Sequence, residues 1–404
     1  MRRARQDMEC RVSKGPVLIA WQRFGPYHHA RADAARRVMP LATLEMSPVD
    51  RTYAWDRVIQ ARPDHFTATE QSLDALSAGQ LRRLLRATLD RISPSVVAVP
   101  GWSERWALII LEWSLDRHVP AVLMSDSNAF DENRTASREW IKRRIVSRFS
   151  AGLAGGTMAA DYLVQLGMDR KAVFSGYDVV DNSHFQTATP ARMDAARTVA
   201  LGRPFFLASA RFIPKKNLAG LLKAYAAYRQ RAGSDAWALI VLGDGPLRPK
   251  LERLRTELSL SDDVVFPGFK QYGELPAWYA AAEAFILPST AEQWGLVVNE
   301  AMAAGLPVLV SRRCGCAVDL VEEGKNGFVV DPFQIEDMTH AMWRIAHGGV
   351  DRKALGAGSR EIIRNWSPGR FADGLRQATA AAAQTPEKNC SLFHRALFRA
   401  LVHR

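Results

Sequence analysis

The 404-residue chain is predicted to be an α/β protein with two doubly wound domains, each built on a parallel β-sheet. Its length exceeds what one hydrophobic core usually supports. Apolar runs of strand length alternate with helical patterns in both halves, which is typical of β–α–β units and therefore of parallel sheets. A polar, proline-bearing stretch at residues 186–204 separates the halves and indicates a linker.

Composition limits the class of protein. Hydrophobic residues make up 48% of the chain and charged residues 24%, which is ordinary for a globular protein with substantial cores. The formal net charge of +12 and the sequence pI near 9.8 favour an anionic partner. Nucleic acid, a phospholipid surface and a phosphorylated substrate all fit that charge, and charge alone does not choose among them.

The cysteines and the apolar runs bear on the cellular compartment. Four cysteines, unevenly spread, argue against a disulfide framework and favour a reducing cytoplasm. Cys314 and Cys316 have no second Cys or His pair at metal-ligand spacing, so we interpret them as packing residues. The first apolar run, residues 16–21, is too short for a signal peptide, and no run approaches the roughly 18 apolar residues of a membrane-spanning helix. The sequence therefore predicts a soluble or peripheral protein.

In the first half, residues 16–24 have the pattern of a buried strand that leads into a turn and a helix. Gly25, His28 and His29 follow the carboxyl end of that strand, which is the edge where such sheets bind ligands. A plain strand–helix connection with surface histidines explains the same pattern equally well.

A polar residue follows a later strand of the same half. Residues 94–126 show strand, buried-helix and strand patterns in succession, and Asp126 ends the last of these strands. The Asp126 carboxylate is a candidate to orient a substrate hydroxyl. The alternative that it caps the next helix is favoured from sequence, because aspartate is a common N-cap residue.

Two basic segments have helical periodicity. In residues 133–149, Trp140, Ile145 and Phe149 recur at helical spacing among arginines. Such a helix can lie against an anionic bilayer or bind an anionic acceptor, and the alternative is a core-facing helix with a solvated basic side. Near the end of the chain, basic residues lie beside an apolar stripe formed by Leu392, Phe393, Ala396, Leu397, Ala400 and Leu401.

The second half begins with a strand pattern that places Arg211 at its carboxyl end. Lys216 follows five residues later, at the start of a predicted helix. Two cations beside a helix start can neutralise a diphosphate, and a guanidinium can do so with two hydrogen bonds. The next strand pattern ends in a turn with Gly243 and Gly245, which allows the backbone to approach closely at the sheet edge.

A later stretch combines an acidic loop, a glycine and a helix. Glu292 lies in the loop, and Glu300 follows eight residues later on the helix. The amides of Gly295, Leu296 and Val297 begin that helix, so they have no partners inside it and suit an anionic group such as a diphosphate. Two carboxylates on either side of this anion site can accept hydrogen bonds from sugar and ribose hydroxyls.

The E-x7-E spacing of Glu292 and Glu300, with three motifs before it and one after it in a fixed order, resembles the retaining glycosyltransferases of family 4. The resemblance is good over roughly residues 200–370 and weak over the first half. It implies the GT-B fold, in which two Rossmann-like, doubly wound parallel-sheet domains face each other across a cleft. The chain departs from the family at Asp126, where relatives carry a histidine nearby, and at residues 176–180, where they carry Asn-Gly-Val-Asp.

The resemblance also implies roles for the site residues. The catalytic group is Glu292, Arg211 and Lys216, where the two cations contact the donor diphosphate and Glu292 holds the sugar hydroxyls. Donor binding is assigned to Gly295, Leu296, Val297, Glu300 and Gly25, with Glu300 on the ribose. Candidate acceptor-side residues are His28, His29 and Asp126.

The predicted domain organisation has five parts. They are an N-terminal Rossmann-like acceptor domain at residues 1–187, an interdomain linker at 188–203, a C-terminal Rossmann-like donor domain at 204–366, a helix crossing back to the N-terminal domain at 367–385, and a basic amphipathic extension at 386–404.

The predicted function is retaining transfer of a hexosyl group from a nucleotide-diphosphate sugar to an acceptor hydroxyl, in surface polysaccharide or glycolipid biosynthesis. The acceptor would be a glycan or a lipid-linked molecule, and the protein would be cytoplasmic and peripheral on the inner face of an anionic membrane. No cofactor beyond the donor, no metal and no nucleic acid are expected, and the chain has no D-x-D motif. The alternatives are another GT-B enzyme, such as a nucleotide-sugar epimerase or a phosphorylase, or a non-catalytic basic protein that binds membranes or polyanions.

Overall fold

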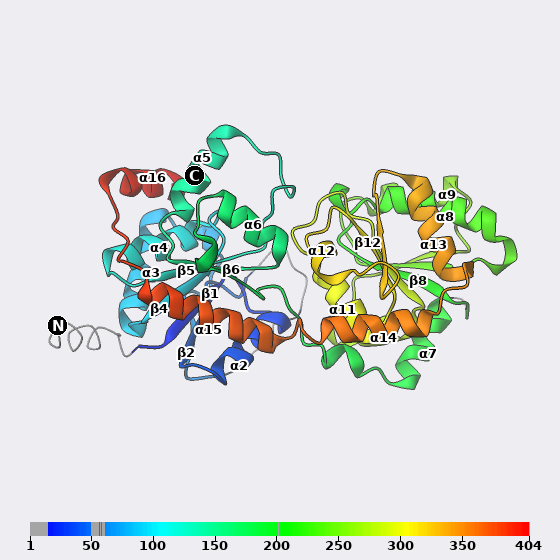
Figure 1. Cartoon of the computed structure of the whole chain (residues 1–404), viewed down its shortest axis with the longest axis horizontal. Coiled ribbons are helices and arrows are strands. Elements are labelled where there is room, and N and C mark those ends of the chain that lie inside the picture. Colours follow the sequence, from blue (N-terminus) through cyan, green and yellow to red (C-terminus); the bar gives the residue numbers. More distant parts are fainter. Residues whose placement is uncertain (1–14, 50–55, 57, 59–60, 201, 404) are drawn as a thin grey trace. The chain divides into compact units, whose positions relative to one another are not determined.

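The computed structural model describes residues 15–49, 56, 58, 61–200 and 202–403 (Figure 1). Cys10 and the basic N-terminal stretch lie outside these residues. The chain forms two compact units. Unit 1 comprises the chain up to Ala129, Asn133–Asp178, and the chain from Pro368 onward, and unit 2 comprises Phe130–Glu132 and Val179–Ser367.

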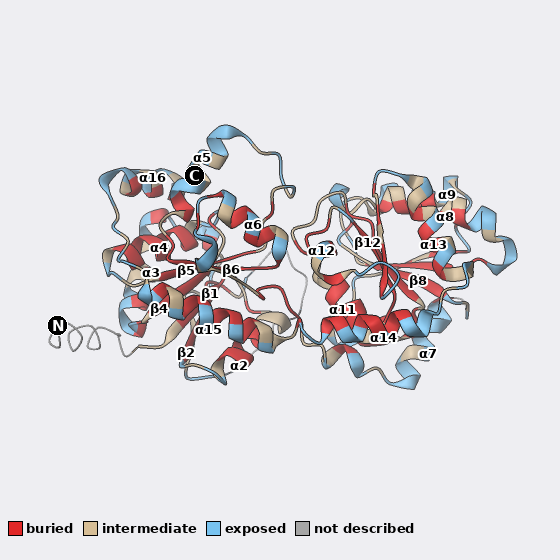
Figure 2. Ribbon diagram, in the orientation of Figure 1, coloured by how far each residue is buried: buried red, intermediate tan, exposed pale blue. Residues whose placement is uncertain are grey.

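Unit 1 is built on a seven-stranded parallel sheet with the order β3-β2-β1-β4-β5-β6-β7. The central strands are apolar along their whole length and buried, as expected where helices cover both faces of a parallel sheet (Figure 2). The strands are β1 (Val17–Trp21), β2 (Leu41–Glu45), β3 (His65–Thr67), β4 (Val96–Pro100), β5 (Ala121–Ser125), β6 (Ala151–Ala154) and β7 (Val173–Ser175).

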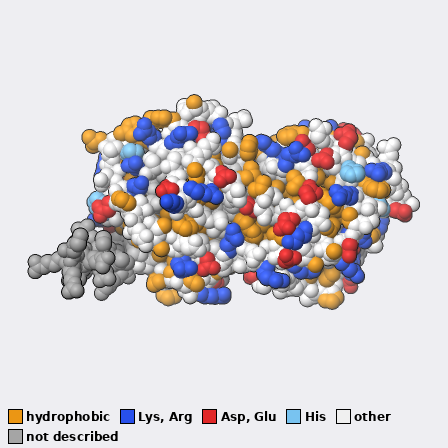
Figure 3. Space-filling view, viewed as in Figure 1, with side chains coloured by type: hydrophobic (Ala, Val, Ile, Leu, Met, Phe, Trp, Pro, Cys, Tyr) orange, Lys and Arg blue, Asp and Glu red, His pale blue; other side chains and the backbone are white. Residues whose placement is uncertain are grey.

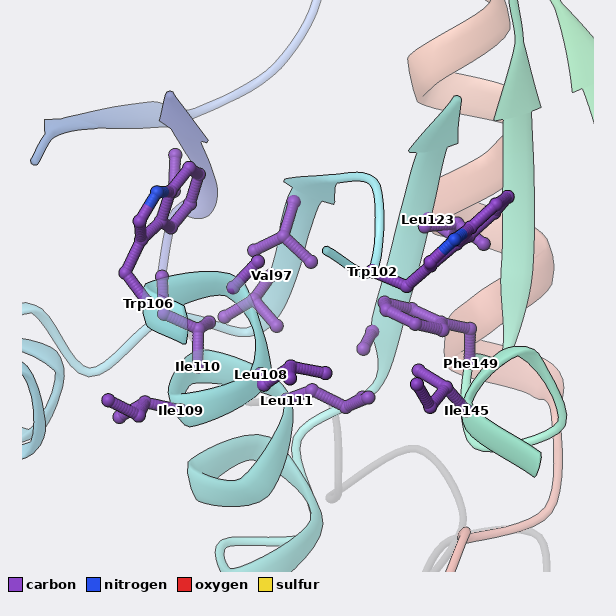
Figure 4. Close-up of a cluster of buried hydrophobic side chains, with 14 of the residues drawn as sticks. Val97, Trp102, Trp106, Leu108, Ile109, Ile110, Leu111, Leu123, Ile145 and Phe149 are labelled. Atoms are coloured by element: carbon purple, nitrogen blue, oxygen red, sulfur yellow. The ribbon is translucent and has the colours of Figure 1, made fainter. Parts of the chain in front are cut away.

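The helices of unit 1 include one that is buried almost throughout. In α4 (Arg105–Asp116), every residue from Trp106 to Leu115 is buried, and its side chains pack with those of β4, β5 and the end of α5 (Figure 4). The other helices are α2 (Pro26–Arg36), α3 (Ala78–Ile92), α5 (Ala136–Val146), α6 (Thr157–Gln165), α15 (Pro368–Gln384) and α16 (Leu392–Val402), with short 3₁₀ turns η1 (Leu73–Ala75) and η2 (Arg170–Ala172).

Unit 2 contains a six-stranded parallel sheet with the order β10-β9-β8-β11-β12-β13. Its strands are β8 (Phe205–Ser209), β9 (Ala238–Leu242), β10 (Val264–Gly268), β11 (Ala284–Leu287), β12 (Val308–Ser311) and β13 (Gly327–Val330). The chain direction across the sheet reverses between β8 and β11, and such a switch point is where open parallel sheets bind ligands. The predicted fold class, two doubly wound parallel sheets, is confirmed.

Helices cover both faces of the second sheet as well. They are α7 (Pro190–Val199), α8 (Leu218–Ala232), α9 (Arg248–Glu257), α10 (Leu275–Ala281), α11 (Leu296–Ala304), α12 (Ala317–Leu320), α13 (Ile335–His347) and α14 (Arg352–Ile363). The 3₁₀ turns are η3 (His184–Gln186), η4 (Pro214–Lys216), η5 (Gly233–Asp235) and η6 (Tyr272–Glu274).

The observed units divide the chain at points that the sequence did not indicate. The stretch predicted as a linker, residues 188–203, contains α7, which packs on α10 within unit 2. Its proline at the first helical turn is preset for helix, so the polar, proline-bearing composition that suggested a linker also suits a surface helix. The helix predicted to cross back, α15, packs on α2 and belongs to unit 1.

Among the described helices, none has both the length and the apolar character that crossing a bilayer requires.

Candidate active site

The switch point of unit 2 collects the residues predicted to bind the donor. Strand β8 leads directly to Arg211 and then to η4, which ends at Lys216. Strand β11 leads to the loop that carries Glu292 and then to α11, which carries Glu300. The local sequence therefore places all four charged residues at the carboxyl edge of one sheet.

The glycine turn after β9 fixes the backbone beside Arg211. Gly243 has a φ of 118°, and a Cβ atom there would collide with the Ala210 carbonyl oxygen, so this close approach requires glycine. The Phe212 amide donates to the Asp244 carbonyl oxygen at 2.8 Å. The Arg211 side chain is exposed, and within the described part of the chain it has no hydrogen-bond or ion-pair partner. The backbone that carries Arg211 is therefore fixed, and its guanidinium is available to a ligand.

Lys216 and Glu292 are 76 residues apart in sequence, and they form an ion pair through Lys216 Nζ and Glu292 Oε2. Their side chains are 15% and 11% exposed. The Ser289 hydroxyl donates to the same carboxylate oxygen at 3.2 Å. The Thr290 amide donates to the Lys215 carbonyl oxygen at 2.8 Å, which ties the acidic loop to η4. The structure thus joins a predicted phosphate-binding cation to a predicted sugar-binding carboxylate.

The start of α11 presents backbone amides at the same edge. Gly295 adopts a left-handed conformation with φ 107° and is the N-cap of the helix. The first helical bond of this turn runs from the Val298 amide to the Gly295 carbonyl oxygen at 2.9 Å. Leu296 and Val297 are only partly buried, and their amides begin the helix without partners inside it. Trp294, which is buried and packs on Trp366 with ring centroids 4.8 Å apart, anchors the loop below.

Glu300 is buried in an aromatic surrounding that the sequence did not indicate. Its carboxylate accepts a hydrogen bond of 2.7 Å from the Tyr279 hydroxyl and is 2% exposed. Burial, together with the charge and hydrogen bond of Glu300, raises the pKa of Tyr279 well above its usual value, so this tyrosine remains a donor. Burial and the charges of Asp181 and Glu300 also raise the pKa of Tyr272, whose ring stacks on His184 at 3.8 Å. Only contacts between distant segments reveal this group, and no spacing signal marks it.

His28 and His29 are not exposed surface residues. The Gly25 amide donates to His28 Nδ1 at 3.1 Å, which requires that nitrogen to be unprotonated. Burial, followed by the charges of Arg31 and His29, lowers the pKa of His28 to about 3. His29 is 6% exposed, its Nε2 lies 3.2 Å from the Val58 carbonyl oxygen, and burial lowers its pKa. Of the two, His28 is the more accessible and is a neutral hydrogen-bonding group at pH 7.

Asp126 does not cap the next helix, so the capping interpretation is wrong. The N-cap of α5 is Thr135, whose hydroxyl accepts from the Arg138 amide at 3.4 Å. Asp126 instead lies near Asp178, and burial and the Asp126 charge raise the pKa of Asp178 to about 7.

The partner of Asp178 is Arg31, another residue that sequence reasoning missed. The two side chains form an ion pair of 3.5 Å and are 3% and 6% exposed. The Arg31 guanidinium also lies 5.1 Å from the ring centre of Tyr177, whose hydroxyl accepts from Trp21 Nε1 at 3.1 Å. The only signal for this group in the sequence was the departure from the family pattern at residues 176–180.

The predicted site residues therefore form two sets. Arg211, Lys216, Glu292, Gly295, Leu296, Val297 and Glu300 lie in unit 2, whereas Gly25, His28, His29 and Asp126 lie in unit 1. Within the described ranges, no group of three or more His, Cys, Asp or Glu side chains is arranged to hold a metal ion. Cys314 and Cys316 are buried without a disulfide bond, as predicted for packing residues.

Comparison with known proteins places this geometry in context. Residues 192–362 match the family described as Glycosyl transferases group 1. The second half of the chain carries the signature of that superfamily. The match covers β8 to α14, and so it includes every predicted site residue of unit 2.

Two curated relatives extend the likeness. The chain is 31% identical over 215 residues to a GDP-mannose-dependent alpha-(1-6)-phosphatidylinositol monomannoside mannosyltransferase of Mycobacterium tuberculosis, which covers 50% of this chain and 55% of that one. It is 29% identical over 297 residues to the D-inositol 3-phosphate glycosyltransferase of Saccharomonospora viridis, covering 70% of this chain and 68% of that one. The chain thus spans little more than half the length of the mannosyltransferase.

Solved structures establish the architecture. The structure of Anabaena HepE in complex with UDP superposes with a TM-score of 0.71 at 19% identity, over 90% of this chain and 99% of that one. At this identity the likeness concerns the fold, and the fold is GT-B.

Proposed function

We propose that this chain is a glycosyltransferase that moves a hexosyl group from a nucleotide-diphosphate sugar to an acceptor hydroxyl with retention at the anomeric carbon. One observation carries the proposal. The exposed Arg211, the Lys216–Glu292 ion pair and the open first turn of α11 lie together at the switch point of unit 2.

The donor's diphosphate would bind to Arg211, Lys216 and the first amides of α11. In the structure, Glu292 is the anionic partner of Lys216, and the diphosphate of a donor could take its place. Donor binding would therefore give Lys216 a new anionic partner and leave Glu292 able to accept hydrogen bonds from sugar hydroxyls. Glu300, whose carboxylate is positioned by the Tyr279 hydroxyl, would bind the ribose.

The same cations would serve the transfer step. The acceptor oxygen bonds to the anomeric carbon as the bond from that carbon to the β-phosphate oxygen breaks, and the acceptor proton passes to the leaving phosphate. Negative charge grows on that phosphate toward the transition state, where fixed cations and amide dipoles stabilise it most. Acceptor-side roles for His28, His29 and Asp126 remain predictions.

The relatives support the substrate classes. HepE is solved with UDP, and the mycobacterial relative is named for GDP-mannose and a phosphatidylinositol mannoside. We infer a nucleotide-diphosphate sugar as donor and a glycan or lipid-linked acceptor, in surface polysaccharide or glycolipid synthesis at the cytoplasmic face of the membrane.

A thermal-shift experiment over GDP, UDP and ADP, with the matching monophosphates, tests the donor site. We expect one diphosphate to raise the melting temperature more than the others and more than its own monophosphate, because the proposed cations contact the second phosphate. Equal small shifts with all six would contradict the donor site. Isomerisation of a donor sugar without acceptor would favour the epimerase alternative.

A further inference from the structure

Two helices of unit 1 leave large apolar side chains on the surface. Trp140 of α5 is 47% exposed, and Phe393 and Leu392 of α16 are 47% and 86% exposed. Figure 3 shows hydrophobic and basic side chains side by side over these helices. We refer to Trp140, Arg143, Arg144, Leu392 and Phe393 as the Trp140–Phe393 surface.

Both helices are anchored by other residues. At the end of α5, Ile145 and Val146 are buried, and Phe149 just beyond it packs with Ile145 in the core (Figure 4). In α16, Phe398 and Val402 are fully buried, and the helix packs on α4. Each helix therefore has buried anchors besides its exposed aromatic residue.

The prediction that the apolar stripe is the buried face of α16 was wrong. The buried line runs through His394, Phe398 and Val402, which are spaced by four residues. Leu392 and Phe393, both assigned to the stripe, point away from that line and are exposed. Four of the six stripe residues, Leu392, Phe393, Ala396 and Ala400, are thus exposed after the helix has docked.

The exposed aromatic side chains form one group across the two helices. The rings of Trp140 and Phe393 meet edge to face with centroids 5.8 Å apart. The Arg144 guanidinium lies 5.2 Å from the Trp140 ring centre and 5.9 Å from that of Phe393. A tryptophan and an arginine that combine apolar area with a polar end are suited to the boundary between lipid headgroups and acyl chains.

The charge around this group is positive. Arg143 and Arg144 are exposed, and within the described ranges neither has an ion-pair partner. Glu139 is the one acid of α5, and it pairs with Lys142 at 3.3 Å. Helix α16 contains no acid. Two copies of this surface would repel each other, which argues against self-association through it.

The surface lies near the edge of the sheet that carries Asp126. Lys142, one turn after Arg138, contacts the Tyr162 hydroxyl of α6 at 3.2 Å, and α6 begins just after the carboxyl end of β6. Trp102, which follows β4, lies 6.2 Å from the Tyr162 ring. The first turns of α5 therefore neighbour the loops at the carboxyl edge of the sheet in unit 1.

We propose that the Trp140–Phe393 surface docks unit 1 onto an anionic phospholipid bilayer, with Trp140, Phe393 and Leu392 entering the headgroup region and Arg143 and Arg144 contacting lipid phosphates. This inference deepens the proposed function, since it gives a lipid-linked acceptor a route to the carboxyl edge of unit 1. Apolar area and positive charge together give peripheral binding that depends on anionic lipid and on salt.

Vesicle flotation with the full chain tests the docking surface. We expect it to float with vesicles of phosphatidylcholine and phosphatidylglycerol but not with phosphatidylcholine alone, and to be released by salt. Arg143→Gln and Arg144→Gln should each weaken binding about fivefold, and Trp140→Ala with Phe393→Ala should weaken it at least about tenfold. Truncation of α16 is unsuitable, because it would remove core residues.

Phe333→Ala is the matched control, because Phe333 lies in unit 2 and is 65% exposed. Failure of the intact chain to float with anionic vesicles at low salt would overturn the docking proposal, as would equal flotation with neutral vesicles or an equal loss in the Phe333 control. Melting temperature and the nucleotide thermal shift are measured on every variant. Loss of the nucleotide shift with normal flotation would contradict the donor site alone, so the two proposals fail separately.

Discussion

Each unit holds an ion pair at the carboxyl edge of its sheet, but the two pairs have different surroundings. Lys216 and Glu292 keep 15% and 11% of their side chains exposed, beside an open helix start. Arg31 and Asp178 are 3% and 6% exposed and have the further charge of Asp126 nearby. A partly accessible ion pair can exchange one partner for a ligand. In the buried pair, desolvation and the second carboxylate disfavour the ionised form of Asp178, so its protonation depends on pH.

The largest expected effect is on the pH dependence of stability, when the buried Arg31–Asp178 pair is removed by Asp178→Asn. The pKa of Asp178 is raised from its usual value near 3.8 to about 7, so between these values the folded protein holds a proton that the unfolded chain has lost. Stability contributed by this group is complete below about pH 4 and is lost as pH rises through about 7, by up to about 4 kcal/mol. Asp178→Asn removes this titration.

Chemical denaturation from pH 5 to pH 8 measures the difference. The free energy of unfolding of Asp178→Asn relative to the native chain should rise with pH. Asp161→Asn is the matched control, because Asp161 pairs with Arg170 at the surface of the same unit. Parallel pH profiles for Asp178→Asn and the native chain would show that Asp178 is ionised throughout.

The second prediction concerns the accessible pair. Arg211→Ala and Lys216→Ala should each lower turnover about 100- to 1,000-fold, the range for removing one preorganised group that stabilises transition-state charge. The KM for acceptor should change little, because the charge they stabilise grows on the leaving phosphate. Steady-state kinetics gives both quantities, with Lys215→Ala as the control, since Lys215 is the exposed neighbour. Activity that survives both changes, or that requires an added divalent cation, would refute this assignment.

The comparison also shows what sequence could predict. The alternation of strands and helices was sufficient for the fold class, and the strand–loop–helix pattern was sufficient to place Glu292 and Glu300 after the carboxyl end of β11. Spacing could not indicate that Lys216 contacts Glu292, because that contact depends on how η4 and a loop 76 residues away pack together.

Unit 1 was harder to predict for a physical reason. Its polar group is assembled from α2, the loop after β5 and the segment after β7, so Arg31, Asp126 and Asp178 share no local pattern. In α16, Phe398 was not placed on the stripe, yet tertiary packing on α4 selected its face over that of Leu392 and Phe393. Periodicity predicts an amphipathic helix, but where two faces are apolar the neighbouring helix decides which is buried.

The third prediction sharpens the role of Glu300. Glu300→Ala should weaken nucleotide-diphosphate binding by about 1.5 to 3 kcal/mol, as expected when hydrogen bonds to a charged group are lost. Tyr279→Phe removes only the hydroxyl that holds the carboxylate and should weaken binding less. Calorimetric titration with the preferred diphosphate and with its nucleoside separates ribose contacts from phosphate contacts. Unchanged affinity in Glu300→Ala would exclude the ribose role.

The smallest expected effects are the changes in stability caused by substituting Thr135 and Asp126, which lie between β5 and α5. Thr135 is the N-cap of α5, so Thr135→Ala should lower the free energy of unfolding by about 1 kcal/mol at every pH. Asp126→Asn removes no cap and should instead lower the pKa of Asp178, because a neighbouring negative charge is gone. Its effect on stability should therefore depend on pH, and it should be most favourable above pH 7, where Asp178 is ionised. If Asp126→Asn lost stability uniformly with pH, as Thr135→Ala should, then Asp126 would act as a local structural residue and the acidic pair would not control the titration of unit 1.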